Sequence, residues 1–316
     1  MFKQTFDQLP ETIWVTAVQV ATVWTAPASP REIDRPALTN AVDMENWLSS
    51  LTTTEKLAWS EDNLIQTQLL YGDVVQVIET HGDWAKVVIP AQASKKDERG
   101  YPGWVPITQL RQTTKTVWMK EKAITVTAKN AWMQDEQSQQ KIKLSFMTTL
   151  PLLAVSKGKA FVGTPQGKGS LLETDITVHT RTTGLEPTGS GQDILAAGKQ
   201  FMQLPYFWGG MSSFGYDCSG FAHMMHKSAG YIIARDASDQ AGSGKEITYQ
   251  KALPGDLLFF AHEAGKGSIH HVGIYAGNGN MLHAPQTGKG IEIISLAGSK
   301  YEPELCTIRR YWKKES

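Results

Sequence analysis

The sequence predicts an α+β protein built from two small β modules followed by a mixed α+β domain. Short β-branched segments separated by turn residues fill the chain from about residue 12 to residue 180. Helical spacing of apolar residues begins only after residue 190. The segment TTGLEPTGSG, rich in Gly, Thr, Ser and Pro, separates the two parts and indicates a linker.

Length and composition limit the classes of function. At 316 residues the chain has room for more than one domain, and its 41% hydrophobic content argues against disorder. The 31 Lys and Arg residues balance 31 Asp and Glu residues, so no overall positive field attracts nucleic acid or an anionic membrane. We expect no nucleic-acid partner and no membrane insertion, because no segment approaches the roughly 18 apolar residues of a membrane span.

The beginning of the chain shows no signal-peptide pattern, since MFKQTFDQLPETIW lacks an apolar run before a small-residue cleavage site. As it stands the sequence therefore predicts a cytoplasmic protein. A chain from which a signal peptide had been removed would look the same and would be secreted or wall-associated.

The first predicted module covers residues 12–112. The segments TAVQVATVW, VVQVIE and DWAKVVIP have strand character and are separated by turns, which indicates a small barrel. An insertion, ALTNAVDMENWLSSLTTTEKL, carries apolar residues at helical spacing. We expect it to form one helix packed on the barrel.

A second β module is predicted over residues 113–180, from KTVWMK, AITVTA and KLSFMTTLPLLAVS. After the linker at 181–190, residues 191–316 begin with two helical patterns and continue with the strand-like segments DLLFFA, HHVGIYA, NMLHAP and IEIISL. Helices followed by consecutive strands are typical of an α+β domain.

Cys218 is the first candidate for chemistry. It lies between Asp217 and Ser219 where a Gly-rich loop ends and a helix is expected to begin. Free N–H groups and the helix dipole favour a reactive thiolate there. A buried structural cysteine is the commoner role of a single Cys, and on these grounds alone both roles stay open. Cys306, in a late strand, is expected in the core, and the two cysteines match no zinc-binding spacing, so no metal site is expected.

His271 and His283 can supply the base that a thiol nucleophile needs and the group that orients this base. They lie on the two strands of a predicted hairpin. A two-residue turn at Asn278-Gly279 would place His283 on the face away from His271. A three-residue loop, Gly277 to Gly279, with a left-handed Gly279 would pair His283 with Gly273 and let the two rings meet. We therefore expect the three-residue loop.

Several motifs of the last domain resemble those of NlpC-type cell-wall cysteine peptidases. In chain order they are Pro205-Tyr206-Phe207-Trp208-Gly209-Gly210, Asp217-Cys218-Ser219-Gly220-Phe221, Arg235-Asp236-Ala237, Leu253-Pro254-Gly255-Asp256-Leu257, His271-Val272-Gly273-Ile274-Tyr275 and His283-Ala284-Pro285. The resemblance implies a papain-like cysteine peptidase domain that acts without a cofactor.

The β modules resemble bacterial SH3 domains, small SH3-like β barrels. Leu69-Leu70-Tyr71-Gly72 and Gly100-Tyr101-Pro102-Gly103-Trp104 are similar to the first such domain of γ-D-glutamyl-L-diamino-acid endopeptidases. The resemblance implies hydrolysis of the bond from γ-D-glutamate to diaminopimelate or Lys in peptidoglycan stem peptides, preferably stems with a free N-terminal L-Ala. We expect the enzyme to be a monomer.

The resemblance also implies roles for single residues. Cys218 is the expected nucleophile, His271 the general base and His283 the residue that orients it. The hydroxyl of Tyr206 and the Cys218 backbone N–H are expected to stabilise the oxyanion.

Substrate contacts are expected from Asp217, Ser219, Asp236 and Tyr101, with the Asp236 carboxylate pairing with the free amine of the stem peptide. Gln66 stands where the subfamily often carries a Glu that helps to bind this amine. An uncharged Gln weakens the expected selectivity for a free amine.

Two other functions fit the same residues. An amidase or acyltransferase can use the same fold and the same Cys-His-His set with another acceptor or leaving group. A wall-binding protein with an inactive catalytic domain is the second alternative, and the intact set of Cys218, His271, His283 and Tyr206 argues against it.

Overall fold

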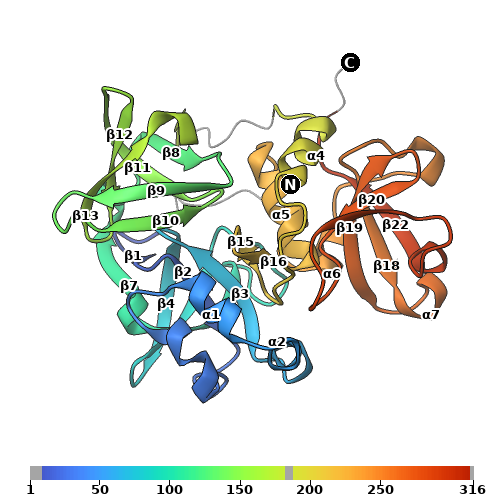
Figure 1. Ribbon diagram of the computed structural model, residues 1–316, viewed down its shortest axis with the longest axis horizontal. Coiled ribbons are helices and arrows are strands. Elements are labelled where there is room, and N and C mark those ends of the chain that lie inside the picture. The colour runs from blue at the N-terminus through green and yellow to red at the C-terminus, as the bar shows by residue number, and fades with distance from the viewer. Residues whose placement is uncertain (1–8, 182–187, 314–316) are drawn as a thin grey trace.

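The computed structural model describes residues 9–181 and 188–313. Within these ranges the chain forms two seven-stranded sheets, one two-stranded hairpin and one six-stranded sheet. The seven-stranded sheets make up the β modules, and the six-stranded sheet belongs to the last domain (Figure 1). The predicted fold class, two β modules followed by an α+β domain, is confirmed.

The first module is an antiparallel sheet with the strand order β3-β2-β6-β5-β4-β1-β7. Its strands are β1 (Thr12–Thr16), β2 (Val20–Trp24), β3 (Ile65–Leu70), β4 (Val74–His81), β5 (Trp84–Ile89), β6 (Tyr101–Pro106) and β7 (Leu110–Thr114). A 3₁₀ turn (Ile107–Gln109) separates β6 from β7, and the short helix α3 (Lys115–Trp118) follows β7.

The second module repeats this topology, with the order β10-β9-β13-β12-β11-β8-β14. Its strands are β8 (Lys122–Val126), β9 (Asn130–Asp135), β10 (Lys141–Ser145), β11 (Thr149–Ser156), β12 (Lys159–Thr164), β13 (Gly167–Leu172) and β14 (Ile176–Thr180), with a 3₁₀ turn (Glu173–Asp175) before β14. The two orders correspond strand for strand, so the chain contains the same β module twice.

The insertion between β2 and β3 corrects one prediction. It forms a 3₁₀ helix (Glu32–Leu38) and two α-helices, α1 (Met44–Ser50) and α2 (Thr53–Glu61), instead of one helix. Leu51 has extended backbone angles, φ −98° and ψ 137°, which end α1. Thr52 and Glu55 then form a capping box, each side chain accepting a hydrogen bond from the other residue's backbone N–H, and this starts α2.

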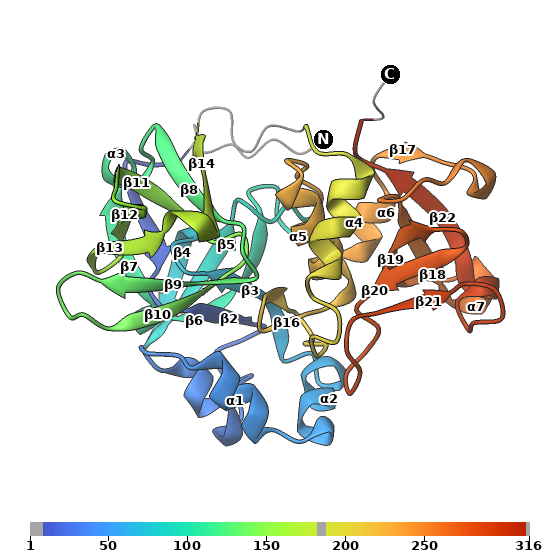
Figure 2. The ribbon, with the colours of Figure 1, turned by 45° about the horizontal axis from the view of Figure 1, so that its top comes forward.

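The last domain packs helices against an antiparallel sheet with the order β17-β22-β18-β19-β20-β21 (Figure 2). The strands are β17 (Lys245–Glu246), β18 (Leu257–Ala261), β19 (Ile269–Gly277), β20 (Asn280–His283), β21 (Glu292–Ser295) and β22 (Leu305–Arg310). The helices are α4 (Gly191–Lys199), α5 (Cys218–Ser228), α6 (Ala237–Ala241) and the single turn α7 (His262–Gly265), and a hairpin of β15 (Met211–Ser212) and β16 (Gly215–Tyr216) precedes α5. Short 3₁₀ turns lie at Tyr249–Lys251 and Glu302–Glu304. In the described part of the chain, no helix has the length and apolar character needed to cross a membrane.

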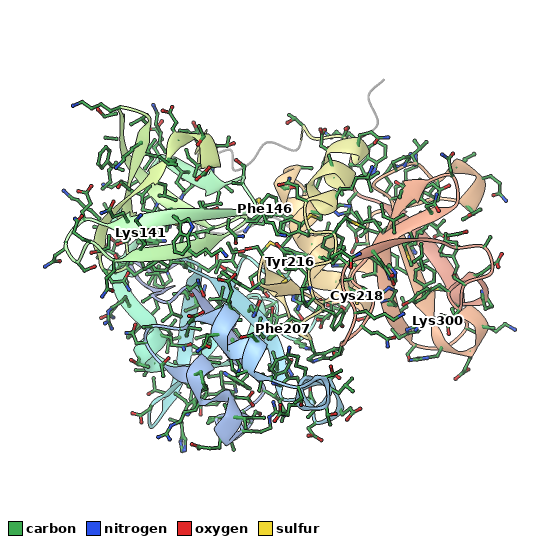
Figure 3. All side chains as sticks on the ribbon, in the orientation of Figure 1. Lys141, Phe146, Phe207, Tyr216, Cys218 and Lys300 are labelled. Atoms are coloured by element: carbon green, nitrogen blue, oxygen red, sulfur yellow. The ribbon has the colours of Figure 1, made fainter. Side chains whose placement is uncertain are left out.

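Aromatic side chains join the first module to the last domain. Phe207, labelled in Figure 3, lies 4.8 Å from Trp59 of α2 and 5.9 Å from Trp47 of α1, measured between ring centroids. Both Trp side chains are buried. Buried aromatic contacts of this kind fix the position of the loop that leads to Cys218.

Polar contacts hold β3 against the same loop. The buried Gln68 accepts hydrogen bonds through Oε1 from the Met211 N–H and the Ser212 hydroxyl, both at 2.9 Å. The Trp208 indole N–H donates to the Ile65 carbonyl at 3.2 Å. The first module is therefore part of the support of the catalytic loop.

Candidate active site

Cys218 is the first residue of α5, as the sequence predicts. The helix packs against β19, and Figure 3 shows Cys218 where α5 meets the sheet of the last domain. Its side chain is partly exposed. The first N–H groups of a helix have no partner within the helix, so they are available to a reacting group beside the thiol.

Asp217 caps α5, and all its oxygens are engaged. It accepts hydrogen bonds from the Gly220 N–H at 2.6 Å and the Gly209 N–H at 2.9 Å. It also forms an ion pair of 2.6 Å with Arg235, a residue that is only 1% exposed. Asp217 thus organises the start of the helix; a direct contact with substrate stays a prediction.

Arg235 links three parts of the site. Its guanidinium donates to the Ser219 hydroxyl at 2.8 Å and to the Thr67 hydroxyl of β3 at 2.9 Å, in addition to Asp217. Ser219 is buried, and its hydroxyl donates to Asp217 at 3.2 Å. Like Asp217, Ser219 stabilises the start of α5, and its expected substrate contact stays a prediction.

His271 and His283 form a direct hydrogen bond of 2.8 Å between Nε2 of His271 and Nδ1 of His283. Both imidazoles are buried. Nε2 of His283 lies 3.7 Å from a carboxylate oxygen of Glu292 on β21. This carboxylate favours the tautomer of His283 that carries its proton on Nε2. Nδ1 of His283 then accepts the hydrogen bond from Nε2–H of His271, and Nδ1 of His271 is left unprotonated as the free base.

The hairpin that carries the two histidines has the expected register but not the expected loop. Tyr275 pairs with Met281 and Ile274 with Leu282, which places His283 opposite Gly273. The turn is nevertheless the two-residue type, with Asn278 and Gly279 at positive φ. A bulge at Ala276 shifts the register by one residue. His283 therefore lies on the same face of the sheet as His271, as expected from the three-residue loop.

Burial raises the pKa of the Cys218 thiol to about 12, and the Asp217 carboxylate adds to this effect. The backbone N–H of Val272, next to His271, acts in the opposite direction. Burial and the Asp217 carboxylate therefore oppose the thiolate that the free N–H groups at the helix start favour, and they shift Cys218 toward the neutral thiol.

The two histidines are neutral for the same physical reason. Burial lowers the pKa of His271 well below its usual value, and nearby His283, His270 and Lys300 add to the effect. Burial, with Lys300 and Lys289, lowers the pKa of His283 to about 4. His271 is thus a neutral base at physiological pH.

Tyr206 lies near enough to the thiol to interact with it electrostatically. It is buried, and burial together with the nearby Cys218 raises the pKa of its hydroxyl well above the usual value. The hydroxyl stays protonated and can donate a hydrogen bond to an oxyanion beside Cys218.

Tyr301 covers the histidine pair and was not singled out by the sequence. Its ring stacks on His271 at 4.8 Å and meets the edge of His283 at 5.3 Å. A hollow beside this ring is lined by Lys289, Lys300 and Glu292 among others. A tyrosine in the irregular loop before β22 belongs to no motif, so only the fold shows this contact.

The three residues expected to recognise the substrate amine come together at the boundary with the first module. The Tyr101 hydroxyl donates to Asp236 at 3.0 Å, and Gln66 lies 3.5 Å from the same hydroxyl. Lys96, which the sequence did not indicate, contacts all three residues. We call Gln66, Lys96, Tyr101 and Asp236 the boundary cluster.

Cys306 is exposed, which contradicts the expectation that it lies in the core. Thr307 pairs with Phe259 and Leu305 with Phe260, so Cys306 is the extra residue of a bulge in β22. This bulge breaks the alternation of the strand and turns the side chain outward.

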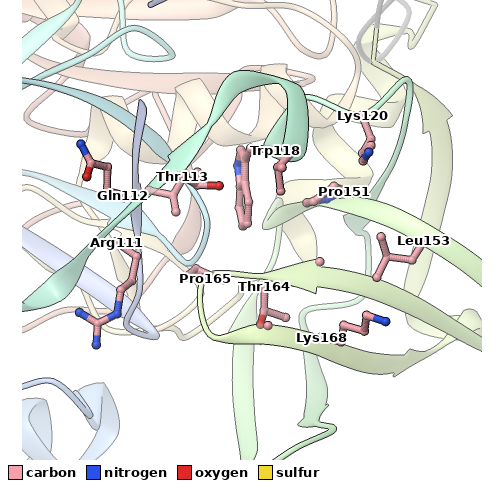
Figure 4. Close-up of a pocket in the computed structure, with 14 residues that line it drawn as sticks. Arg111, Gln112, Thr113, Trp118, Lys120, Pro151, Leu153, Thr164, Pro165 and Lys168 are labelled. Atoms are coloured by element: carbon pink, nitrogen blue, oxygen red, sulfur yellow. The ribbon is translucent and has the colours of Figure 1, made fainter. Parts of the chain in front are cut away.

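A separate pocket lies between the two β modules, away from Cys218 (Figure 4). Trp118 stands in it, with Arg111 and Lys168 among the lining residues. No cysteine or histidine of the described residues lines it, so it offers no nucleophile or imidazole base. Among the described residues we also find no group of three or more His, Cys, Asp or Glu side chains placed to hold a metal ion.

Comparison with known proteins gives the same assignment for each part. Residues 203–310 match the NlpC/P60 family, residues 60–110 the bacterial dipeptidyl-peptidase SH3 domain, and residues 126–179 the YKFC SH3b2 domain. The chain is 44% identical over 291 residues to the γ-D-glutamyl-L-lysine dipeptidyl-peptidase of Bacillus subtilis (strain 168), covering 92% of this chain and 96% of that protein. The chain belongs to the NlpC/P60 family.

Two further comparisons also cover almost the whole chain. A protein of the same description from Bacillus cereus is 39% identical over 93% of this chain and 89% of its own length. A solved structure of an NlpC/P60 family protein from Bacillus cereus aligns with a TM-score of 0.90 at 39% identity and covers 96% of this chain and 100% of that chain. The chain is a cysteine peptidase of this family with two bacterial SH3 domains.

Proposed function

We propose that this enzyme hydrolyses the bond between γ-D-glutamate and the L-diamino acid, diaminopimelate or Lys, in peptidoglycan stem peptides that begin with L-Ala. The observation that carries the proposal is the hydrogen bond between His271 and His283. His271 lies on β19, the strand against which α5 and its first residue Cys218 pack. The relatives described as γ-D-glutamyl-L-lysine dipeptidyl-peptidases support the choice of substrate.

The reaction begins from a neutral thiol and a neutral imidazole. His271 takes the proton from Cys218 as the sulfur attacks the γ-carbonyl carbon of D-glutamate. The carbonyl oxygen becomes an oxyanion, to which Tyr206 O–H and the Cys218 backbone N–H can donate. His271, held by His283, then passes its proton to the leaving amine of the diamino acid. Water attacks the thioester with His271 again as base, which releases the glutamyl product and restores the thiol.

The described residues of a single chain supply the nucleophile, base, orienting group and oxyanion donor. This arrangement supports action as a monomer.

The first test uses L-Ala-γ-D-Glu-diaminopimelate and L-Ala-γ-D-Glu-Lys, with mass spectrometry of the products. We expect L-Ala-γ-D-Glu and the free diamino acid from wild type, and no product above background from Cys218→Ala, because alanine cannot form the thioester. Cys306→Ala is the matched control and should keep wild-type rates, since Cys306 is exposed on β22, which β18 separates from the strand of His271.

The products also separate the proposal from its alternative. An acyltransferase would yield a glutamyl conjugate of an added amine instead of the free dipeptide, and an amidase would release another fragment. Full activity of Cys218→Ala would exclude the thiol mechanism.

A further inference from the structure

Lys96 is held over the boundary cluster by its own loop. The residues before it bind the last domain: the Ala93 carbonyl accepts from the Arg235 N–H at 2.9 Å, and the Lys95 N–H donates to Asp239 at 2.8 Å. With these two anchors, the Lys96 side chain extends toward Asp236.

The ammonium of Lys96 has three oxygen partners. Nζ lies 2.9 Å from Gln66 Oε1 and 3.3 Å from an Asp236 carboxylate oxygen, and it donates to the Tyr101 hydroxyl. It also lies 4.3 Å from the centre of the Tyr101 ring, within the range of a cation–π interaction. Three converging oxygens match the three N–H donors of a primary ammonium.

These same oxygens are the ones that the N-terminal amine of a stem peptide would need. Under the proposed function, on which this step rests, that amine pairs with Asp236 beside Tyr101. A protonated L-Ala amine and the Lys96 ammonium cannot both take these acceptors. We propose that Lys96 is a specificity-determining residue that competes with the substrate amine and so reduces the preference of the enzyme for free over N-acylated stem peptides.

Charge supports this assignment. Asp236 carries the single negative charge of the boundary cluster and Lys96 neutralises it, while Gln66 and Tyr101 are uncharged. A free amine must displace Lys96 to gain an ion pair, whereas an N-acylated stem leaves the Lys96–Asp236 pair intact. Displacement is feasible because the side chains of Lys96 and Asp236 are 44% and 30% exposed, and exposed ion pairs are weak.

The test compares kcat/KM for L-Ala-γ-D-Glu-Lys with kcat/KM for its N-acetylated form. Lys96→Met keeps the aliphatic stem but removes the charge, so we expect the ratio of free to acetylated peptide to rise about fivefold or more. The rise should come from a lower KM for the free peptide and a higher KM for the acetylated one, with kcat unchanged.

Gln66→Glu provides a second route to the same net charge. It leaves Lys96 in place and adds a carboxylate, which can pair with the amine while Lys96 pairs with Asp236. The ratio should rise in this variant as well. Lys95→Met is the matched control: Lys95 is exposed, faces Asp239 at 3.6 Å and lies outside the boundary cluster, so its ratio should equal that of wild type.

The measured ratios decide whether Lys96 competes with the substrate amine. A ratio that stays within about twofold of wild type in Lys96→Met, or that rises in Lys96→Met but not in Gln66→Glu, overturns competition between the two cations. If wild type cleaves neither peptide, the proposed function itself fails; cleavage with unchanged ratios in the variants removes only the role of Lys96.

Discussion

The pKa shifts of Cys218 and His271 both favour the neutral form of the group, because burial penalises the charged form of each. For the thiol, burial and Asp217 act together to raise the pKa. For the imidazole, burial and nearby positive charge lower it. Proton transfer between the two groups is therefore coupled to the arrival of substrate, when the oxyanion donors have a charge to stabilise.

The lowered pKa of His271 predicts the pH dependence of the reaction. A base with a depressed pKa stays unprotonated while the pH falls through the usual histidine value of 6.5, and it is lost only below that. We expect kcat/KM to keep its plateau through pH 6.5 and to decline well below it, measured with a free stem peptide in constant ionic strength.

A variant at Lys300 should shift this pH profile in a known direction. Lys300→Gln removes one positive charge that acts on both histidines, so the acidic limb should move to higher pH. A wild-type acidic limb centred at or above pH 6.5 would contradict the neutral resting state.

At the residue scale, the nucleophile, the base and its orienting histidine could be predicted because each lies in a short local motif. Arg235 also lies in a motif, yet its role depends on Thr67, which is 168 positions away. Tyr301 and Lys96 lie in irregular loops whose position is set by packing. Contacts between distant loops leave no periodic signal in the sequence.

Among the elements, the β19–β20 hairpin decides whether the histidine pair can form. Its register depends on one extra residue, Ala276, in β19. Without the bulge every side chain of β20 would exchange faces, and the ring of His283 would leave the site.

Gly273 on β19 leaves space for the side chains of Met281 and His283 on β20. The substitution Gly273→Ala tests whether the hairpin needs this space. A Cβ at residue 273 would lie 2.2 Å from Met281 Sδ and 3.3 Å from His283 Cβ. We expect a loss of about 1–3 kcal/mol in unfolding free energy, measured in urea, and a lower kcat because His283 is displaced.

Gly242→Ala is the matched control in the same domain, because a Cβ at residue 242 meets nothing closer than 3.5 Å. It should retain wild-type stability and rate. Equal stability of Gly273→Ala and wild type would show that Met281 moves aside without cost and that the hairpin tolerates a side chain there.

Local signals at this scale predicted element type better than element ends. The start of α5 at Cys218 was predicted correctly, since the Gly-rich loop before it is a local signal, and the structure adds Asp217 as its cap. The division of the insertion into α1 and α2 was missed, because the capping box of Thr52 and Glu55 interrupts an otherwise continuous helical pattern. The bulge at Ala276 was missed because a three-residue loop and a two-residue turn preceded by a bulge give the same pairing of the two strands.

Across the whole molecule, the first SH3 domain acts as a structural part of the catalytic site. Gln68 of β3 holds the loop that runs from Tyr206 to Asp217 through the Met211 N–H and the Ser212 hydroxyl. Both donors lie in a buried region. Neither can find water if the acceptor is lost.

Gln68→Leu should therefore affect stability and catalysis together. We expect about 1–3 kcal/mol lower unfolding free energy, because two buried donors lose their partner, and a lower kcat as the loop with Tyr206 loosens. Gln112→Leu, on the exposed side of β7, is the control and should change neither quantity. A Gln68→Leu enzyme with normal stability but reduced kcat would assign Gln68 to the reaction rather than to the loop.

The contact of Phe207 with Trp47 and Trp59 has a consequence for the evolution of this chain. In other relatives, such as the bifunctional muramidase/DL-endopeptidase of Bacillus subtilis (strain 168), the likeness is limited to 107 residues, 34% of this chain. In the present chain the catalytic loop has become dependent on aromatic side chains that another domain supplies. Recombination that joined this catalytic domain to a different neighbour would uncover Phe207 and remove the support of β3, so selection would favour the inheritance of the two domains together.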